Sequence, residues 1–337
     1  MPKVLVTGSA GFIGYHLSRR LLELGWQVTG FDAMTDYYDV ALKTRRHELL
    51  ETFEGFRPEV ARLEEPGRLT RLLDETAPDI VVHLAAQAGV RYSIEDPQSY
   101  VDSNLIGTFN LLEAVRAVPV RHLLMASTSS VYGANEKMPY AETDKADTQM
   151  SFYAATKKAN EAMAHAYAHL YGMPVTMFRF FTVYGPWGRP DMALFRFVRA
   201  ILEGEPIEIY NHGRMRRDFT YVDDLVEALV RLAEVPPTRP ETARDIAPGD
   251  SLSPVAPFRI VNIGNARPVE LMDFVAAVEK ALGREAEKIF LEMQPGDVPA
   301  TWADTLLLQR LTGYCPDTPV EEGVARFVAW YRDYHGL

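Results

Sequence analysis

The sequence is poor in cysteine, in net positive charge and in long apolar segments. Its single cysteine, Cys315, excludes an internal disulfide and any metal site built from several cysteines. We expect this residue to be a half-buried structural thiol rather than a nucleophile. The 35 Lys and Arg residues against 46 Asp and Glu residues give a net charge of −11, which argues against broad binding to nucleic acid or to an anionic membrane surface. No run approaches the roughly 18 apolar residues of a membrane-spanning helix.

The composition that remains is that of an ordinary globular protein. Of the 337 residues, 47% are hydrophobic and 24% are charged, which excludes a disordered or low-complexity chain. At about 150 residues per domain, this length predicts roughly two domains, or one large α/β domain with additions. The first residues enter a strand-like run without the charged and apolar segments of a signal peptide, so we expect a cytoplasmic location.

Short apolar runs alternate with helical patterns along the first half of the chain. The expected strands cover residues 4–7, 27–31, 80–84, 121–126 and 174–181, and the expected helices cover 13–24, 104–117 and 151–171. Strand, helix and strand at this spacing indicate βαβ units and a parallel sheet. The strands are continuously apolar, which is typical of a sheet covered on both faces. A Pro-rich surface loop is expected over 236–257, and the charged residues 43–46 are expected on a solvated helix face.

A glycine-rich segment, Gly8-Ser-Ala-Gly11-Phe-Ile-Gly14, lies between the first expected strand and the first expected helix. Glycine there permits a sharp turn, close approach of a diphosphate to the backbone and close contact between helix and strand. The helix N-terminus adds unpaired N–H groups and a partial positive charge. Asp32 ends the second strand, where its carboxylate can accept hydrogen bonds from a ribose diol, which favours NAD over NADP. A simple turn or cap role for Asp32 stays open.

A Tyr and a Lys four residues apart, Tyr153 and Lys157, project from one face of the expected helix 151–171. Upstream, Ser127 and Thr128 follow a parallel strand, at the edge of the sheet where ligands bind in open α/β folds. Hydroxyl groups, a Tyr and a Lys beside a nicotinamide suit the oxidation of an alcohol. A free Tyr has a pKa near 10, and we expect Lys157 and the positive nicotinamide ring to lower it. The same spacing also occurs in helices by chance.

With these motifs in place, the chain resembles the extended short-chain dehydrogenase/reductase family, in particular its nucleotide-sugar epimerases and dehydratases. Within that group the resemblance is closest to the UDP-glucuronate 4-epimerases, and it runs from residue 3 to about residue 304. The glycine and Tyr/Lys motifs indicate only the superfamily, whereas the segments after Tyr184 favour the glucuronate branch. The similar stretches are residues 4–14, 88–93, 184–192, 214–221 and 294–300.

The resemblance implies a hidden redox cycle on NAD. Tyr153 would remove the O4 proton of a UDP-hexuronic acid while C4 gives up hydride, and the 4-keto sugar would turn and regain hydride on its other face. Thr128 would hydrogen-bond O4, and Lys157 would also contact the nicotinamide ribose. The implied cofactor-binding residues are Gly8, Gly11, Phe12, Ile13, Gly14, Asp32, Leu84, Ala85, Ala86, Gln87, Asn104, Ser127, Tyr153 and Lys157.

The substrate residues implied by the resemblance distinguish branches of the family. Related dehydratases carry an Asp-Glu pair after the catalytic Thr, whereas Ser129 and Ser130 stand here and supply hydroxyl groups without an acid. Arg189 offers a fork suited to a carboxylate. Thr182 stands where galactose epimerases usually have Asn. Turn-forming serines, a loop ion pair at Arg189 and a plain strand residue at 182 are the structural alternatives.

Two further residues are predicted to hold the UDP moiety. Arg217 is the candidate for the diphosphate, with Arg216 a surface charge, and Tyr210 is the candidate to flank uridine, unless it is simply packed. No metal site is expected, because the histidines lack the spacing of metal ligands.

The predicted architecture is a Rossmann-type doubly wound parallel sheet with a smaller, mixed α/β C-terminal lobe. An NAD-binding domain is expected over 1–180, with about 215–262 returning to it, and a discontinuous substrate lobe over 181–337. The predicted activity is the 4-epimerisation of UDP-glucuronate to UDP-galacturonate without net redox change or decarboxylation. UDP-glucose/UDP-galactose 4-epimerase, UDP-glucuronate decarboxylase and a non-catalytic NAD-binding regulator are the alternatives. The family also implies a homodimer.

Overall fold

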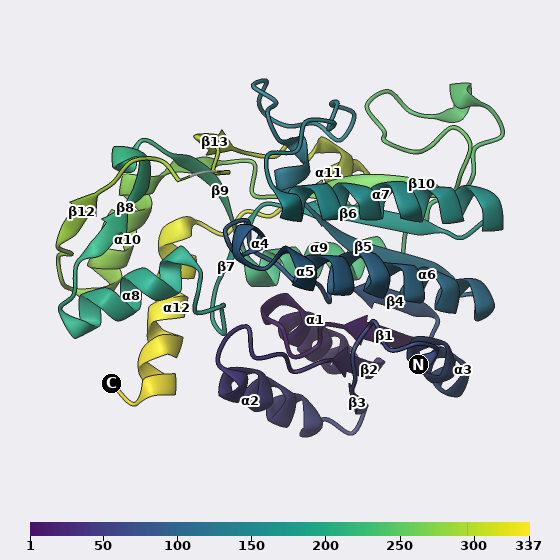
Figure 1. Ribbon diagram of the computed structural model, residues 1–337, viewed down its shortest axis with the longest axis horizontal. Coiled ribbons are helices and arrows are strands. Elements are labelled where there is room, and N and C mark those ends of the chain that lie inside the picture. The colour runs from purple at the N-terminus through teal and green to yellow at the C-terminus, as the bar shows by residue number, and fades with distance from the viewer. Residues whose placement is uncertain (295) are drawn as a thin grey trace.

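A parallel sheet of seven strands organises the larger part of the computed structural model, which describes residues 1–294 and 296–337 (Figure 1). The strand order is β10-β6-β5-β4-β1-β2-β3, and every neighbouring pair is parallel. The order reverses direction between β1 and β4, which is the switch point where open α/β sheets bind ligands. The strands are β1 (Lys3–Thr7), β2 (Gln27–Asp32), β3 (Phe56–Val60), β4 (Ile80–His83), β5 (His122–Thr128), β6 (Val175–Phe180) and β10 (Phe258–Ile263).

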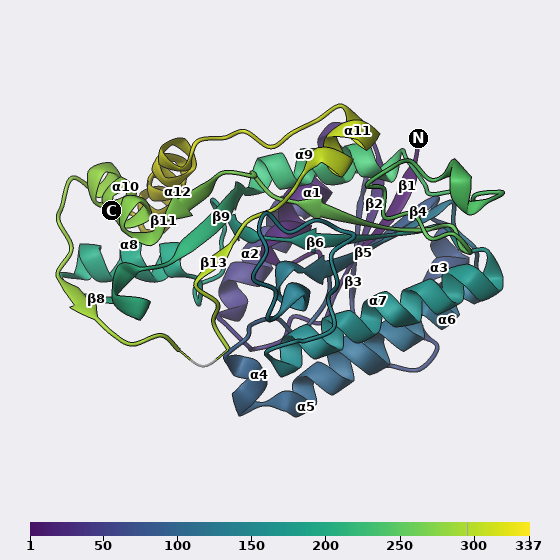
Figure 2. The same cartoon turned by 90° about the horizontal axis from the view of Figure 1, so that it is seen from above.

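Helices cover both faces of this sheet. Figure 2 shows α6 and α7 together on one face and α1 and α9 on the other, and two separate apolar clusters fill these two layers. The helices are α1 (Phe12–Glu23), α2 (Val40–Glu51), α3 (Arg68–Thr76), α4 (Tyr92–Glu95), α5 (Pro97–Tyr100), α6 (Gly107–Ala117), α7 (Phe152–Tyr171), α9 (Val222–Ala233) and α11 (Leu306–Thr312). A π-helical segment, Val101–Ile106, runs directly into α6. The predicted doubly wound, Rossmann-type fold is confirmed.

The smaller lobe is a mixed α/β unit built after β6. In its larger sheet β9 pairs with β7 and β13 in parallel and with β11 in antiparallel orientation, and β8 pairs with β12 separately. The strands are β7 (Thr182–Tyr184), β8 (Ile207–Ile209), β9 (Arg216–Tyr221), β11 (Pro268–Glu270), β12 (Lys288–Phe290) and β13 (Ala300–Thr301), and the helices are α8 (Ala193–Glu203), α10 (Leu271–Leu282) and α12 (Val320–His335). Pro295, within the family-like stretch 294–300, lies outside the described residues.

Local sequence explains where the helix that carries Tyr153 begins and ends. The Ser151 side chain accepts a hydrogen bond from the Ala154 N–H, which caps the first turn of α7. Gly172 follows the last turn with φ of 66°, a left-handed conformation that glycine adopts at little cost. Strand β5 continues two residues beyond the expected end, because Ser127 and Thr128 pair with Arg179 and Phe180 of β6.

Two expectations about exposure are wrong. The charged residues 43–46 do not form one solvated face: Arg45 is exposed, as expected, but Lys43 is 5% exposed and Arg46 is fully buried. The Lys43 side chain donates to the Thr35 carbonyl, and the Arg46 side chain donates to the Ala10 carbonyl of the glycine-rich loop. Cys315 is exposed rather than half-buried, because it lies in the loop between α11 and α12, where its sulfur is 3.7 Å from the Pro316 carbonyl and 4.0 Å from the Thr305 hydroxyl. The 236–257 segment is a loop, as expected, interrupted by one short helical turn, Ala243–Asp245.

The buried carboxyl group of Glu142, beside the end strand β10, predicts that the stability of the protein depends on pH. Glu142 accepts the Asn262 N–H at 2.8 Å, and burial raises its pKa from 4.5 to about 7. The folded state therefore binds more protons than the unfolded state between about pH 4.5 and 7. As a result, ionisation of Glu142 lowers the free energy of unfolding as pH rises through that window. Glu142→Gln keeps the carbonyl acceptor without the charge.

We expect Glu142→Gln to match the wild type at pH 4 and to be more stable at pH 8, by roughly 3 kcal/mol if the whole shift is expressed. Denaturant unfolding at both pH values measures the difference. Replacement of the exposed Glu136 by Gln is the matched control and should change neither curve. Equal stabilities of Glu142→Gln and the wild type at pH 8 would contradict the assignment.

Candidate active site

The glycine-rich loop joins β1 to α1 at the switch point of the sheet. Gly8 has φ of 76°, and a Cβ atom on it would lie 2.7 Å from the backbone N of Ala85, at the end of β4. A Cβ on Gly14 would overlap the Gly8 carbonyl, so both positions require glycine for close backbone approach. Gly11 is the N-cap of α1 and brings no side-chain acceptor, which leaves first-turn N–H groups for an external anion. Phe12 and Ile13 form that first turn.

Asp32 is fixed beside this loop at the end of β2. One carboxylate oxygen accepts the Ala10 N–H at 3.0 Å and the other accepts the Met34 N–H at 2.8 Å. Asp32 thus has the turn-stabilising role that the sequence left open. A carboxylate can accept about four hydrogen bonds, so capacity remains for a ribose hydroxyl. The uncapped helix, the glycine cradle and this carboxylate together fit a dinucleotide with a free ribose diol.

The segment 84–87 at the end of β4 is held by Asn104 from the π-helical turn. The Asn104 side chain accepts the Gln87 N–H at 2.9 Å and donates to the Gln87 carbonyl at 3.0 Å. It also donates to the Thr156 hydroxyl on α7 at 3.0 Å. Asn104 thus fixes the backbone of the segment after β4 that contains Leu84, Ala85 and Ala86.

Lys157 extends from α7 beneath the end of β5. Its ammonium donates to the Ala126 carbonyl at 3.1 Å, and the residue is 3% exposed. Burial lowers the pKa of Lys157 to about 8, so the side chain is still mostly charged at neutral pH.

Tyr153 lies one turn before Lys157, with its ring edge-on to Tyr100 at a centroid distance of 6.0 Å. Burial raises its pKa, while the Thr128 hydroxyl and the Arg189 charge act to lower it. Removal of the phenol from water outweighs these two effects, and the lowering expected from Lys157 together with the positive nicotinamide ring stays a prediction.

A buried ion pair missed by the sequence analysis supports this side of the site. Glu161, on the same face of α7 as Tyr153 and Lys157, accepts two hydrogen bonds from Arg179 of β6, at 2.8 and 2.9 Å. The Ser127 hydroxyl donates to the same carboxylate at 2.7 Å. The pair thus fixes Ser127, and with it the end of β5, against α7. The spacing of four residues from Lys157 places Glu161 on this face of α7, but nothing in the local sequence indicates Arg179 as its partner.

The serines after Thr128 line a pocket with Tyr140, Met150 and Ser151. The Thr128 hydroxyl accepts the Ser130 N–H at 3.2 Å, so these residues also form a short helical turn, Ser129–Tyr132. The turn considered as an alternative for Ser129 and Ser130 is therefore present, and both half-buried serines also line the pocket.

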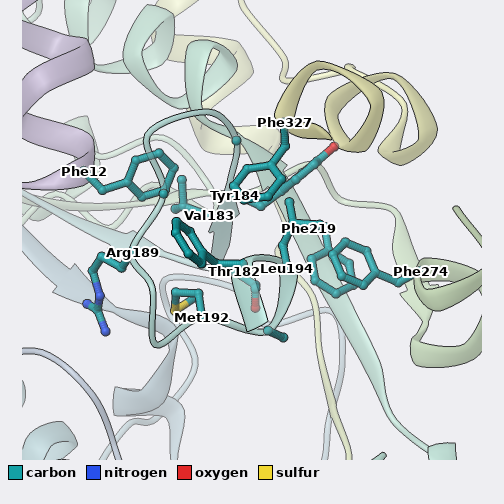
Figure 3. A pocket seen from close by; sticks show the side chains of 14 residues that line it. Phe12, Thr182, Val183, Tyr184, Arg189, Met192, Leu194, Phe219, Phe274 and Phe327 are labelled. Carbon is teal, nitrogen blue, oxygen red and sulfur yellow. The ribbon is translucent and has the colours of Figure 1, made fainter. Parts of the chain in front are cut away.

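Arg189 and Thr182 line a second pocket, which is also lined by several aromatic rings (Figure 3). The guanidinium of Arg189 points away from the Tyr184 and Phe327 rings. Its Nε and Nη2 donate to the two carboxylate oxygens of Asp191 at 2.9 and 2.5 Å. The loop ion pair considered as an alternative therefore exists. An arginine has five N–H donors, so others remain for a second acceptor.

The two residues predicted for UDP belong to the smaller lobe, Arg217 in β9 and Tyr210 directly after β8. Arg217 donates only to the neighbouring Arg216 carbonyl at 3.0 Å in the described residues, and burial lowers its pKa. A half-buried guanidinium whose positive charge has so few hydrogen-bond acceptors suits an anionic ligand. Arg216 is exposed, as expected, and pairs with Glu270.

Tyr210 donates to Glu208 at 2.7 Å, and its ring lies 4.6 Å from the guanidinium of Arg91. Arg91, on the turn before α4, also reaches Asp297 at 3.5 Å. Sequence reasoning gave Arg91 no role, although it belongs to a family-like stretch.

Within residues 1–294 and 296–337, no three His, Cys, Asp or Glu side chains gather in a way that could hold a metal ion. Over the same part of the chain, no helix combines the length and the apolar character needed to span a membrane.

Comparisons with known proteins agree with this geometry. The NAD dependent epimerase/dehydratase family matches residues 4–245. The chain is 58% identical over 329 residues to a protein of Rhizobium meliloti (strain 1021) named "Probable UDP-glucuronate 4-epimerase", covering 98% of this chain and 96% of that one. It is 46% identical to UDP-glucuronate 4-epimerase 1 of Arabidopsis thaliana, over 99% of this chain and 77% of the relative. The crystal structure of UDP-glucuronic acid 4-epimerase from Bacillus cereus with UDP-glucuronic acid and NAD superposes with a TM-score of 0.87 at 34% identity, covering 98% and 99% of the two chains.

Proposed function

The chain belongs to the NAD dependent epimerase/dehydratase family, and we propose that it interconverts UDP-glucuronate and UDP-galacturonate by NAD-dependent epimerisation at C4. The observation that carries the substrate choice is the arrangement around the catalytic end of β5. Two serines without an adjacent acid follow Thr128 and line one pocket, and Arg189 is close enough for its charge to act on the pKa of Tyr153. Hydroxyl groups and an arginine are the groups that recognise a carboxylate.

NAD, when bound, accepts hydride from C4 of the sugar and returns it, so the cycle has no net redox change. The glycine loop and the N-terminus of α1 would hold the diphosphate of NAD, and Asp32 its adenosine ribose. Leu84, Ala85, Ala86 and Gln87 would lie along the nicotinamide half, with Ser127 and Asn104 behind them. These roles are supported by the close backbone approach at Gly8 and by the uncapped helix.

Proton transfer would be the work of Tyr153. Its phenolate oxygen would form an O–H bond as the O4–H bond of the sugar breaks, and the proton would return to O4 after the keto sugar has turned. Thr128 would hydrogen-bond O4, and Lys157 would stabilise the phenolate and contact the nicotinamide ribose. The buried, charged Lys157 and the Thr128 contribution to the pKa of Tyr153 support these roles.

The sugar carboxylate would be held by Arg189, Thr182, Ser129 and Ser130. A 4-keto uronic acid is a β-keto acid and can lose CO2, so an epimerase must hold the carboxylate in an orientation that disfavours that loss. Arg217 would bind the UDP diphosphate and Tyr210 would flank the uridine. The partly uncompensated charge of Arg217 supports the first of these.

The division of the chain into an NAD-binding domain over 1–180, with about 215–262 returning to it, and a substrate lobe over 181–337 remains a proposal, as does the cytoplasmic location. We also propose a homodimer formed through α6 and α7, which lie side by side on one face (Figure 2). Exposed apolar side chains on these helices support it, namely Phe109, Phe152, Leu170 and Tyr171. Light scattering should give twice the monomer mass of 37.9 kDa, and a monomer would contradict it.

Incubation of the purified chain with NAD and UDP-glucuronate tests the proposed function. We expect UDP-galacturonate to accumulate without release of CO2, and chromatography of the sugar nucleotides measures it. Release of CO2 with a UDP-pentose would instead identify a UDP-glucuronate decarboxylase. Conversion of UDP-glucose to UDP-galactose with no action on UDP-glucuronate would identify a UDP-glucose 4-epimerase. NAD binding without any conversion would indicate a non-catalytic regulator.

A further inference from the structure

The most deeply buried arginine of the chain lies outside the residues assigned so far. Arg46 on α2 is fully buried, and its Nη1 donates to the Ala10 carbonyl at 2.7 Å and to the Tyr38 hydroxyl at 2.8 Å. Its Nη2 donates to the Trp187 carbonyl at 2.5 Å and to the Gly188 carbonyl at 3.5 Å. In the described part of the chain, the hydrogen-bond acceptors of Arg46 are therefore three backbone carbonyls and one hydroxyl group, and none of them is a carboxylate.

The acceptors of Arg46 come from two loops that are far apart in the sequence. Ala10 belongs to the glycine-rich loop before α1, and Trp187 and Gly188 directly precede Arg189. The side chain thus joins the loop proposed to hold the NAD diphosphate to the loop that carries the proposed carboxylate-binding arginine. A planar guanidinium can do this because its two outer nitrogens point in different directions.

The loop before Arg189 has a conformation that needs such support. Trp187 has φ of 59°, in the left-handed region that side chains other than glycine adopt at a cost. Its ring packs on Tyr15 of α1 at 5.5 Å, and His16 hydrogen-bonds the Pro186 carbonyl at 2.8 Å. The carbonyls of three successive residues are therefore held by side chains from α1 and α2.

From these contacts we propose that Arg46 is a positioning residue that couples the dinucleotide-binding loop to the loop of Arg189. Its loss would relax both loops at once, since the hydrogen bonds to Ala10 and Trp187 come from one group. Its positive charge, close to the glycine loop, would also favour the NAD diphosphate. The sugar-specific half of this inference rests on the proposed function, whereas the NAD half does not.

The test compares Arg46→Met, which keeps the length of the side chain without donors or charge, with Arg45→Met, which removes an exposed neighbour paired with Glu48. The dissociation constants of NADH, and of UDP-glucuronate and UDP-glucose at saturating NAD, are measured by fluorescence titration. For Arg46→Met we expect the NADH and UDP-glucuronate constants each to rise about tenfold, the effect of one lost charge-assisted hydrogen bond, while the UDP-glucose constant changes much less. Arg45→Met should behave as the wild type.

Two results would overturn the proposal. One is unchanged binding of NADH and UDP-glucuronate by folded Arg46→Met. The other is an equal loss for the two sugar nucleotides, which would mean a general structural role. If Arg46→Met does not fold, Tyr38→Phe removes only one acceptor of Arg46 and should shift the same constants in the same directions by a smaller factor; no selective shift there would also overturn it. A wild type that does not prefer UDP-glucuronate would count against the proposed function alone.

Discussion

Replacing Tyr153 by Phe is expected to lower kcat for UDP-galacturonate formation by about 10²- to 10⁴-fold, the usual contribution of a positioned acid–base group. The change removes only the phenol oxygen, and the ring can keep its edge-on contact with Tyr100. Binding of NAD should therefore be preserved. Steady-state turnover and titration with NADH measure the two properties separately on the same preparation.

The matched control for this variant is Tyr171→Phe, which removes a hydroxyl group from an exposed ring near the end of the same helix. It should turn over as the wild type does. If Tyr153→Phe retains full activity, Tyr153 is not the group that moves the O4 proton. If it loses NAD binding as well as turnover, the ring is needed to build the site, and the assigned acid–base role is not supported.

Arg189→Ala is expected to raise the dissociation constant of UDP-glucuronate about 100-fold and that of UDP-glucose by much less. Two charge-assisted hydrogen bonds to a carboxylate together contribute roughly 3 kcal/mol, which is about two powers of ten in affinity. Titration of the NAD-loaded protein with both sugar nucleotides measures the difference. An equal loss for both would mean that Arg189 does not bind the carboxylate.

The ion pair with Asp191 complicates this variant and supplies its control. Burial alone would raise the pKa of Asp191, and Arg189 holds it lower, so removal of Arg189 leaves a carboxylate without its partner. In Arg189→Ala/Asp191→Ala that carboxylate is absent, and selectivity should still be lost. A double variant that regains wild-type selectivity would assign the effect to Asp191.

The same substitution has a consequence for pH dependence. Arg189 acts to lower the pKa of Tyr153, so its removal should raise that pKa further. A general base with a higher pKa is ionised less at neutral pH, and the acidic limb of the kcat profile should move to higher pH in Arg189→Ala. An acidic limb at the wild-type position would contradict the electrostatic coupling between the two residues.

Several features followed from the sequence because they depend on short-range patterns. The glycines at 8, 11 and 14, the spacing of Tyr153 and Lys157, and the alternation of apolar strands and helices are each encoded within a few residues. The expected strands and helices appear with their ends shifted by few residues. The resemblance to nucleotide-sugar epimerases rests on the same kind of local pattern, and the family match confirms it.

The environment of charged side chains did not follow in the same way. A charged run at residues 43–46 predicts a solvated helix face, yet Arg46 is fully buried because Ala10 and Trp187 approach it from elsewhere in the chain. The pairing of Glu161 with Arg179 likewise joins α7 to a neighbouring strand. Partners of this kind are set by the packing of distant segments, so no local spacing reports them.

By itself, then, the sequence determined that this chain forms a doubly wound α/β fold with a dinucleotide loop and a Tyr/Lys pair, since backbone preferences and apolar periodicity act over a few residues. Tertiary structure alone decided that Asp191 already occupies two donors of Arg189, that burial raises the pKa of Tyr153, and that Arg46 ties two loops together. The physical reason is that desolvation and hydrogen bonding depend on every segment that folds around a group, and only the folded chain brings those segments together.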